Sequence, residues 1–518
     1  MNMLFKKTIS ILPSAVVAMS LAGCSEAFLD EINKDLDHAT DVESKFIVPQ
    51  LELLTAQNVV GGDFNTYFGA YIEHWTGTHN QLYNIENRMG QERLSTTFNN
   101  SWANVYEAIR DAKIAVAKCS EGGQESGNVL VRSIAKIMLA YNAAVATDVF
   151  GDTPFSQTGN VDSYMNPQID KQEDIYKEIM TLLDDAIANL GGASNTTGSY
   201  DFIYGGKADL WKKFAYGLKA RYTMRLINRS ADKATDYANI ISYVDNSFAN
   251  ASEQASLNVY DGTNQNPVFD FQWSRDGISS SKSLYNKLVD RKDPRAEMAY
   301  VHSYTWEYLD SATVKDYLPD NGDCEQSQYE YAYDYSSMAE LASVHLLSYH
   351  EILFLKAEAQ ARLGMTTPAE ATLKEAIKAS MKNFEENLDA ALNSPTLLKY
   401  DGLEEPASTT IADAEIESYF SVNVKPLYDA DPVKEIMLQK YIAFWGANGE
   451  SVECYNDVRR MKAMGEDVYS LANPKPEKFP LRAGYGTDDT SSNPNIKEAY
   501  GDGMYVYTEN VWWAGGTR

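Results

Sequence analysis

One stretch in the second half of the chain decides the fold. Residues 345–384 read HLLSYHEILFLKAEAQARLGMTTPAEATLKEAIKASMKNF. Apolar residues recur at three- and four-residue spacing on both sides of Gly364, which predicts helices over 345–363 and 367–384 with a turn between them. Small and bulky residues stand at the offsets that tetratricopeptide repeats use, at Ala357, Ala369, Leu373 and Ala376. Because small residues let two helices approach closely, the stretch predicts a helical hairpin of a repeat scaffold.

The same periodicity covers much of the remaining chain. Helical patterns occupy 46–60, 97–119, 129–147, 172–190, 208–229, 236–248, 432–446 and 450–464. Two further pairs fit a stack of hairpins, namely 129–147 with 172–190 and 208–229 with 236–248. We therefore predict a mainly α fold, in which tetratricopeptide-like hairpins form a helical scaffold over about 44–250 and 345–464.

The middle of the chain, about 250–344, has a different pattern. Aromatic rings alternate at period two in three sets: Phe269, Phe271 and Trp273; Tyr300, His302, Tyr304, Trp306 and Tyr308; Tyr329, Tyr331, Tyr333 and Tyr335. Alternation sends one set of side chains to one face of a strand. The pattern predicts an irregular, aromatic-rich ligand-binding lobe with short strands. Residues 465–518 are rich in Gly, Pro, Asn and Ser and predict irregular structure, so we assign 44–518 to a single domain.

The first residues have the form of an export signal. A basic start at Lys6 and Lys7 precedes a short apolar core at 9–20 and the sequence LAGC at 21–24, which has the form of a bacterial lipobox. We predict a lipoprotein signal peptide over 1–23, lipid attachment at Cys24 and a lipid-anchored tether over 24–43. An ordinary secretory signal, in which Cys24 is incidental, is the alternative.

Composition limits the partners. The formal net charge is -28 at pH 7, so the chain lacks the excess of cations that nucleic acid requires, and we predict no nucleic-acid partner. No segment after the signal is predicted to cross a membrane, which leaves the N-terminal lipid as the membrane contact. Three other cysteines lie far apart, at Cys119, Cys324 and Cys454. Buried free thiols and one long-range disulfide both remain open.

Several short strings, in their order along the chain, resemble one family. They are DVFGDTPF at 148–155, WKKFAYGLKAR at 211–221, DPR at 293–295, FWG at 444–446 and YNDVRR at 455–460. Together with the lipobox, they make the chain similar to SusD/RagB-type outer-membrane lipoproteins, with a spacing closest to the second SusD-like branch. The chain departs from the family pattern at Tyr455, where Trp is commoner.

The resemblance implies a function as well as a fold. SusD-like proteins are nutrient-binding lipoproteins on the outer face of the outer membrane, where they cap a SusC-like TonB-dependent transporter and open and close like a lid. The resemblance thus implies a glycan or peptide ligand, a SusC-like partner, no cofactor and no enzymatic activity. It leaves the identity of the ligand open, because binding lobes vary within such families.

The residues of these strings predict mainly scaffold roles. Gly151 and Pro154 indicate a sharp exit from a helix, with Asp148 and Asp152 able to accept hydrogen bonds from exposed backbone N–H groups. In a chain with 73 acidic residues, arginines in such strings predict ion pairs, at Arg221, Arg225, Arg459 and Arg460.

Ligand contacts are predicted where aromatic and polar side chains are mixed. Sugars present apolar faces that stack on Trp and Tyr rings, and hydroxyls that pair with amide, carboxylate and guanidinium groups. The candidates are Trp75, Asn80 and Tyr83 in one probable loop, Trp273 with Arg275, and Trp306 with Tyr308. For each Trp, burial in the core is the alternative.

The sequence contains no catalytic signature. It has no GxSxG, GxxxxGK(S/T), HExxH or GxGxxG motif, and we predict no catalytic residue and no metal site. The string DNGD at 320–323 predicts a turn, because the ligand pattern of a calcium loop is incomplete. Three other functions stay open: a peptide-binding version of the lid, a lipid-anchored glycoside hydrolase with paired carboxylates, and a helical-repeat envelope adaptor without a small ligand.

Overall fold

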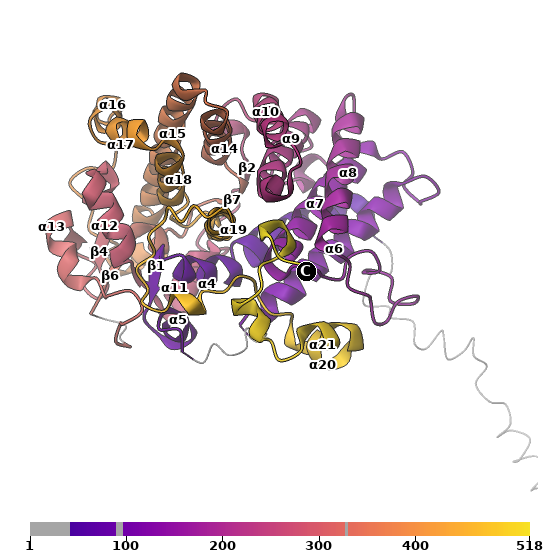
Figure 1. Cartoon of the computed structure of the whole chain (residues 1–518), viewed down its shortest axis with the longest axis horizontal. Helices are drawn as coiled ribbons and strands as arrows, with labels where there is room; N and C mark the ends of the chain where they lie inside the picture. The colour runs from indigo at the N-terminus through magenta and orange to yellow at the C-terminus, as the bar shows by residue number, and fades with distance from the viewer. Residues whose placement is uncertain (1–41, 90–96, 327–329) are drawn as a thin grey trace, which may run out of the picture. The chain divides into compact units, whose positions relative to one another are not determined.

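The computed structural model describes residues 42–89, 97–326 and 330–518. Ser44–Arg518 forms one compact unit. The predicted signal peptide, Cys24 and nearly all of the predicted tether lie outside the described residues. Figure 1 shows the larger unit as a body of helices with a few short strands.

Three helical hairpins form the scaffold. They are α7 (Val129–Phe150) with α8 (Gln172–Leu190), α9 (Ala208–Arg225) with α10 (Lys233–Asp245), and α14 (Tyr349–Arg362) with α15 (Thr366–Leu392). α8 also packs on α9, and α10 packs on α14, so the hairpins stack in chain order (Figure 1). The predicted mainly α fold with tetratricopeptide-like hairpins is confirmed.

Further helices precede and follow this stack in the sequence. Before it come a 3-10 turn (Ser44–Phe46), α3 (Ile47–Leu53), a π-helical segment (Leu54–Val60), α4 (Asp63–Tyr71), α5 (Asn80–Glu86) and α6 (Asn99–Cys119). After it come α16 (Asp413–Tyr419), α17 (Lys425–Ala430), α18 (Pro432–Ala443), α19 (Ser451–Ala463), α20 (Thr487–Ser492) and α21 (Pro494–Tyr500).

The middle lobe combines short strands with short helices. Its antiparallel pairs are β1 (Trp75–Gly77) with β3 (Ile278–Ser280), β2 (Ala255–Leu257) with β7 (Val344–Leu347), and β4 (Tyr300–His302) with both β5 (Tyr308–Leu309) and β6 (Ala332–Asp334). Its helices are α11 (Pro267–Arg275), α12 (Lys282–Arg291) and α13 (Ser311–Val314). The lobe therefore contains the short strands that the alternating aromatics predicted at β4, β5 and β6.

One predicted strand is a helix. Phe269, Phe271 and Trp273 all lie in α11. The Asn266 side chain accepts a hydrogen bond from the backbone N–H of Val268 at 2.9 Å, and Pro267 occupies the first helical turn. An Asn cap followed by Pro is a strong helix start, and it outweighs the period-two pattern of the rings.

Two smaller differences concern where segments begin. Residues 345–347 belong to β7 rather than to the predicted helix, and α14 begins after Ser348, whose hydroxyl accepts a hydrogen bond from the Glu351 N–H at 3.1 Å. Tyr335 begins a 3-10 turn instead of extending β6, and Tyr329 lies outside the described residues.

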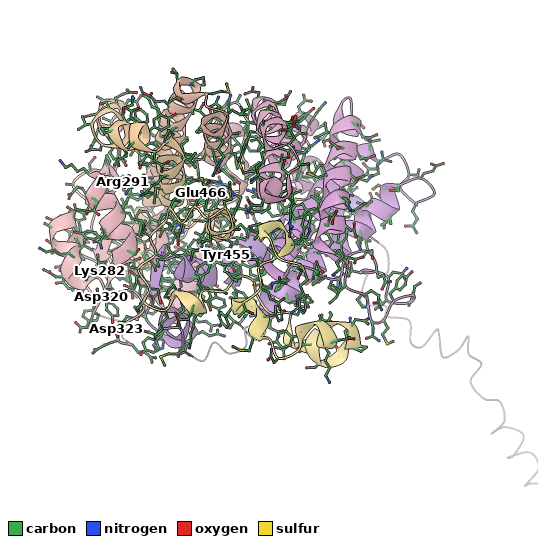
Figure 2. All side chains as sticks on the ribbon, viewed as in Figure 1. Lys282, Arg291, Asp320, Asp323, Tyr455 and Glu466 are labelled. Carbon is green, nitrogen blue, oxygen red and sulfur yellow. The ribbon has the colours of Figure 1, made fainter. Side chains whose placement is uncertain are left out.

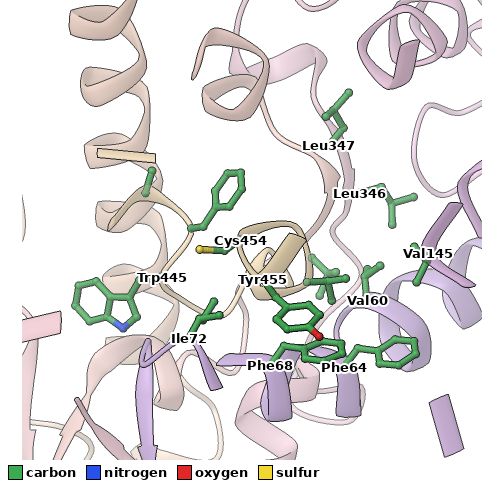
Figure 3. Close-up of a cluster of buried hydrophobic side chains, with 14 of the residues drawn as sticks. Val60, Phe64, Phe68, Ile72, Val145, Leu346, Leu347, Trp445, Cys454 and Tyr455 are labelled. Carbon is green, nitrogen blue, oxygen red and sulfur yellow. The ribbon is translucent and has the colours of Figure 1, made fainter. Parts of the chain in front are cut away.

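The hydrophobic core joins segments that are distant in the sequence. Phe68 of α4 stacks on Tyr455 of α19, with ring centroids 4.0 Å apart and planes at 8° (Figure 3). The Tyr455 hydroxyl donates to the carbonyl of Pro480 at 2.7 Å. A tyrosine at this position thus serves as a packed ring with a satisfied polar tip.

Buried ion pairs connect the helices. Arg221 pairs with Glu351 at 2.6 Å, Arg225 with Asp148 at 3.1 Å and Arg460 with Glu358 at 2.7 Å, and all of these side chains are buried. The prediction of ion pairs is confirmed for these three arginines.

Arg459 differs from the other arginines, and its predicted ion pair is wrong. Its guanidinium donates to the carbonyl oxygens of Leu481 at 2.9 Å and Asp148 at 2.8 Å. It also lies over the Tyr455 ring, 4.2 Å from the centroid. Backbone carbonyls and π faces replace a carboxylate as its partners.

The exit from α7 has the predicted form at most positions. Gly151 ends the helix with a φ of 83°, a conformation that favours glycine. An Asp152 oxygen accepts from the backbone N–H of Gln172 at 2.9 Å, as predicted, whereas Asp148 pairs with Arg225 instead of capping backbone groups.

The prediction that no segment after the signal could cross a membrane needs correction at α7. Within the described residues it is long and apolar enough to span a membrane, which the sequence prediction excluded. Since 83% of its most apolar window is buried inside the body, packing accounts for its composition. Cys119 of the neighbouring helix, Cys324 and Cys454 are buried free thiols.

The turn at 320–323 has exposed carboxylates at Asp320 and Asp323, whereas Asn321 and Gly322 between them are buried. Lys282 of α12 donates to Asp320 at 2.6 Å, and Figure 2 shows the two side chains together with Asp323 at the edge of the molecule. Gly322 has a φ of 76°, which fits the predicted turn.

Candidate functional site: an aromatic pocket beside α11

A pocket of about 220 Å³ lies beside α11. We call it the aromatic pocket, and its lining is Gln272, Trp273, Asp276, Ser303, Tyr304, Trp306, Tyr333 and Met338. Three parts of the lobe therefore meet here: the end of α11, the loop between β4 and β5, and the segment around β6.

Exposed rings form the walls of this pocket. Trp273 is 40% exposed, and its ring stacks on Phe269 one helical turn earlier, with centroids 6.0 Å apart and planes at 7°. The Trp306 ring centroid lies 6.4 Å from that of Trp273, and the Tyr400 ring, next to the lining residues, lies 6.0 Å from Trp273. Tyr304 and Tyr400 are the most exposed of these rings, at 70% and 62%. Soluble proteins rarely leave a large patch of aromatic surface exposed to water, and such a patch indicates a binding site.

A tight loop holds Trp306 in place. Its φ is 59°, a left-handed conformation that is rare for a bulky residue. The His302 Nδ1 atom accepts from the backbone N–H groups of Tyr304 and Thr305 at 3.2 and 3.1 Å. Glu404 closes the loop from outside, because its N–H donates to the Trp306 carbonyl at 3.1 Å. Backbone strain that persists in this way is common at ligand sites.

Polar groups lie at the base of the pocket. The Tyr333 hydroxyl donates to the Asp276 carboxylate, and burial raises the pKa of Asp276, which this hydrogen bond opposes. The Ser303 hydroxyl is buried without a hydrogen-bond partner among the described residues. A hydroxyl that lines a pocket and lacks a partner is available to a ligand hydroxyl.

The structure brings only Trp273 and Trp306 of the predicted candidates together. Trp75 lies in β1 with no exposed surface, and its indole N–H donates to the Thr66 carbonyl at 2.9 Å. It belongs to the core, which was the alternative for each Trp, because its strand is covered on both faces.

The other four candidates lie outside the aromatic pocket. Asn80 and Tyr83 are on α5, with Asn80 exposed at its start and Tyr83 half-buried. Arg275 projects from the opposite side of α11, into a different pocket. Tyr308 uses its hydroxyl to donate to the Glu297 carbonyl at 2.6 Å.

Sequence reasoning missed Tyr304, Tyr400, Asp276 and Ser303. Tyr304 stands in the alternating row that also contains Trp306, so its signal was present in the sequence. Tyr400 ends a 3-10 turn (Leu397–Tyr400) almost a hundred positions after Trp306, and no local pattern links the two.

This arrangement offers the contacts of a binding site. Rings at several angles offer stacking faces for apolar CH surfaces, and the hydroxyl and carboxylate at the base offer hydrogen bonds. Among the described residues, no group of three His, Cys, Asp or Glu side chains is placed to hold a metal ion.

A SusD-like family model, described as "Starch-binding associating with outer membrane", matches residues 37–462. The chain belongs to the SusD-like family. A solved SusD/RagB family protein from Bacteroides thetaiotaomicron is 43% identical, with a TM-score of 0.88, and the match covers 92% of this chain and 100% of that one. The SusD/RagB resemblance is therefore confirmed, and with it nutrient binding and association with the outer membrane as properties of the family.

More distant structures share the fold. A SusD homologue from Bacteroides fragilis is 18% identical with a TM-score of 0.69, and the match covers 92% of this chain and 100% of that one. A chitin-binding SusD homologue from Flavobacterium johnsoniae is 17% identical with a TM-score of 0.63, with 91% and 99% covered. No curated protein matches the chain.

Proposed function

We propose that this protein is a cell-surface lipoprotein that captures an oligosaccharide in the aromatic pocket and delivers it to a SusC-like TonB-dependent outer-membrane transporter. It acts by binding and catalyses no reaction. The lipid at Cys24 holds it on the outer membrane, facing the cell exterior.

The observation that carries the proposal is the pair of indoles that lines one pocket, with the Tyr400 ring beside Trp273. The three rings come from separate parts of the chain, yet the Trp273 centroid lies 6.4 Å from that of Trp306 and 6.0 Å from that of Tyr400, and Trp273 and Tyr400 are exposed. Sugar rings stack on such surfaces, and the unpartnered Ser303 hydroxyl supplies a polar contact at the base. The family description names starch, and one structural relative is named as chitin-binding, so glycans are the first ligands to test.

The test is a binding screen with the purified full-length protein in detergent. Starch, chitin oligosaccharides, other polysaccharides and a peptide mixture are compared by calorimetry and by the shift in melting temperature. We expect a glycan to bind, and we expect Trp273→Ala and Trp306→Ala to weaken it at least about tenfold, because each removes a stacking face.

Trp512→Ala is the matched control. Trp512 is a partly buried tryptophan near Arg229, with the guanidinium 5.0 Å from its ring, and it is not part of the aromatic pocket. Its replacement is expected to leave affinity unchanged. Binding of peptides but no glycan would contradict the proposal, and so would release of reducing sugar from a bound polysaccharide.

A further inference from the structure

A second and larger pocket lies on the other side of α11. It has a volume of about 430 Å³, and we call it the polar pocket. The residues that define its chemistry are Asn58, Asp63, Asn100, Asn104, Asp270 and Arg275. The starts of α4, α6 and α11 supply four of these residues, at Asp63, Asn100, Asn104 and Asp270.

Four polar side chains that line this pocket are free to contact a ligand. Among the described residues, the side chains of Asn58, Asn104, Asp270 and Arg275 make no hydrogen bond or ion pair, whereas Asp63 accepts from Asn100 at 3.2 Å. Amides, carboxylates and a guanidinium that are free to donate and accept suit a ligand with many hydroxyls.

The charge and shape of the pocket narrow the class of ligand. The lining contains two carboxylates and one guanidinium, and this excess of negative charge disfavours a phosphorylated or otherwise strongly anionic ligand. Phe271 also lines the pocket, half-buried, and offers an apolar face beside the polar groups. A neutral sugar unit matches both features, because it presents hydroxyls at its edge and CH groups on its faces.

A single helix separates the two pockets. Asp270, Phe271, Ser274 and Arg275 face the polar pocket, whereas Gln272, Trp273 and Asp276 face the aromatic pocket. At the end of α11, Trp273, Ser274 and Arg275 are exposed and form a ridge between them. A helix with its side chains is about 10 Å wide, a distance that a short oligosaccharide spans.

The geometry points to the polar pocket as a second subsite for the same oligosaccharide, reached by a chain that crosses the ridge from the aromatic pocket. This inference rests on the proposed function. It predicts selection by length: a disaccharide occupies the aromatic pocket alone, and a longer chain occupies both. Joining two weak contacts in one ligand raises the overall affinity without any new site.

The experiment compares short and long probes on the full-length protein. The pairs are maltose with maltoheptaose and chitobiose with chitohexaose, measured by calorimetry. The variant is Asn104→Ala combined with Asp270→Asn, which removes two uncommitted polar groups from the polar pocket. We expect affinity for the long probe to fall about tenfold, the effect of losing one or two hydrogen bonds, while affinity for the short probe stays unchanged.

The controls separate this inference from the proposed function. Asp236→Asn changes a carboxylate in the first turn of α10, as Asp270→Asn does in α11, and is expected to leave both affinities unchanged. If the wild-type protein binds no glycan, the proposed function fails. If the wild type binds glycan but the double variant keeps full affinity for both probes, or loses affinity for the short and long probes equally, the second subsite is refuted. Binding of Ca²⁺ that competes with the long probe and is lost in the double variant would also refute it.

Discussion

At the scale of single residues, two tryptophans of this chain show how environment decides the role of a side chain. Trp273 and Trp75 were equal candidates in the sequence, but one is 40% exposed and the other has no exposed surface. Trp75 fills the space next to Gly69, where an added Cβ would lie only 2.3 Å from the indole. The same residue type therefore lines an exposed pocket at one position and packs in the core at the other.

Replacing Trp75 is expected to damage the fold rather than the site. Trp75→Ala removes a fully buried ring and the hydrogen bond to Thr66, and such truncations cost about 3–5 kcal/mol. Urea denaturation followed by circular dichroism measures the change in the free energy of unfolding. Trp273→Ala is the comparison and is expected to cost much less. Equal losses for both variants would contradict the assignment of Trp75 to the core.

A buried carboxyl predicts a dependence of stability on pH. Glu86 accepts from the Gly322 N–H at 2.6 Å, and its other oxygen has no partner among the described residues. Burial raises the pKa of Glu86 to about 7, against the opposing effect of Arg88. Between about pH 4.5 and 7 the folded protein keeps a proton that the unfolded chain has released, so stability falls as pH rises through this window.

Glu86→Gln is expected to remove that loss. The amide retains an acceptor for Gly322 and cannot ionise, so the variant is close to wild type near pH 5 and more stable at pH 8, by about 3 kcal/mol. Denaturation curves at both pH values test this, with the exposed Glu477→Gln as a control that leaves the dependence unchanged. A Gln variant that is less stable than wild type at pH 8 would show that the carboxylate is favourably solvated.

At the scale of elements, the sequence predicts helices best where apolar residues repeat over several turns. α7, α8, α9 and α14 lie close to their predicted positions, and α15 begins where predicted but continues beyond the predicted end at 384 to Leu392. α11 was mistaken for a strand because Phe269, Phe271 and Trp273 are spaced at two, although Phe269 and Trp273 are also four apart and stack on one face of a helix. The cap at Asn266 and the following Pro267 contained the deciding signal.

The buried ion pair that joins α9 to α14 can be tested directly. Arg221 pairs with Glu351 at 2.6 Å and also lies 3.7 Å from Glu453, with almost no exposed surface. Arg221→Met leaves the Glu351 carboxylate buried without its cation, a change that costs about 3–5 kcal/mol. Adding Glu351→Met is expected to recover part of the loss, which a double-mutant cycle measures by denaturation.

The exposed pair of Lys378 and Asp413 is the control for this buried ion pair. Its contact distance is 2.7 Å, similar to the buried one, but both side chains are at least half exposed. Lys378→Met is expected to leave stability unchanged, because water screens such pairs. If Lys378→Met destabilised the protein as much as Arg221→Met does, burial would not explain the contribution of the Arg221–Glu351 pair to stability.

At the scale of the whole molecule, the site could be predicted only in part. The rings that line the aromatic pocket come from α11, the loop between β4 and β5, and β6, and the turn at Tyr400 places a further ring beside Trp273. Local sequence patterns place Trp273 and Trp306 on aromatic-rich segments. No local pattern predicts that these segments meet, or that Arg275 faces away from Trp273. Tertiary packing decides both, and so it decides which of the candidates can share a ligand.

The last prediction concerns the anchoring of the whole protein. Cys24→Ala removes the thiol on which a lipid would be attached, and each buried CH₂ of an acyl chain contributes about 0.8 kcal/mol to membrane binding. We expect the variant to leave the outer-membrane fraction, and we expect only the wild type to incorporate labelled fatty acid and to be cleaved by protease added to intact cells. Cys119→Ala changes a buried cysteine of α6 and is expected to remain membrane-bound. Retention of the Cys24→Ala protein in the membrane, with no labelled lipid on the wild type, would show that contacts of the folded body and not a lipid hold it there.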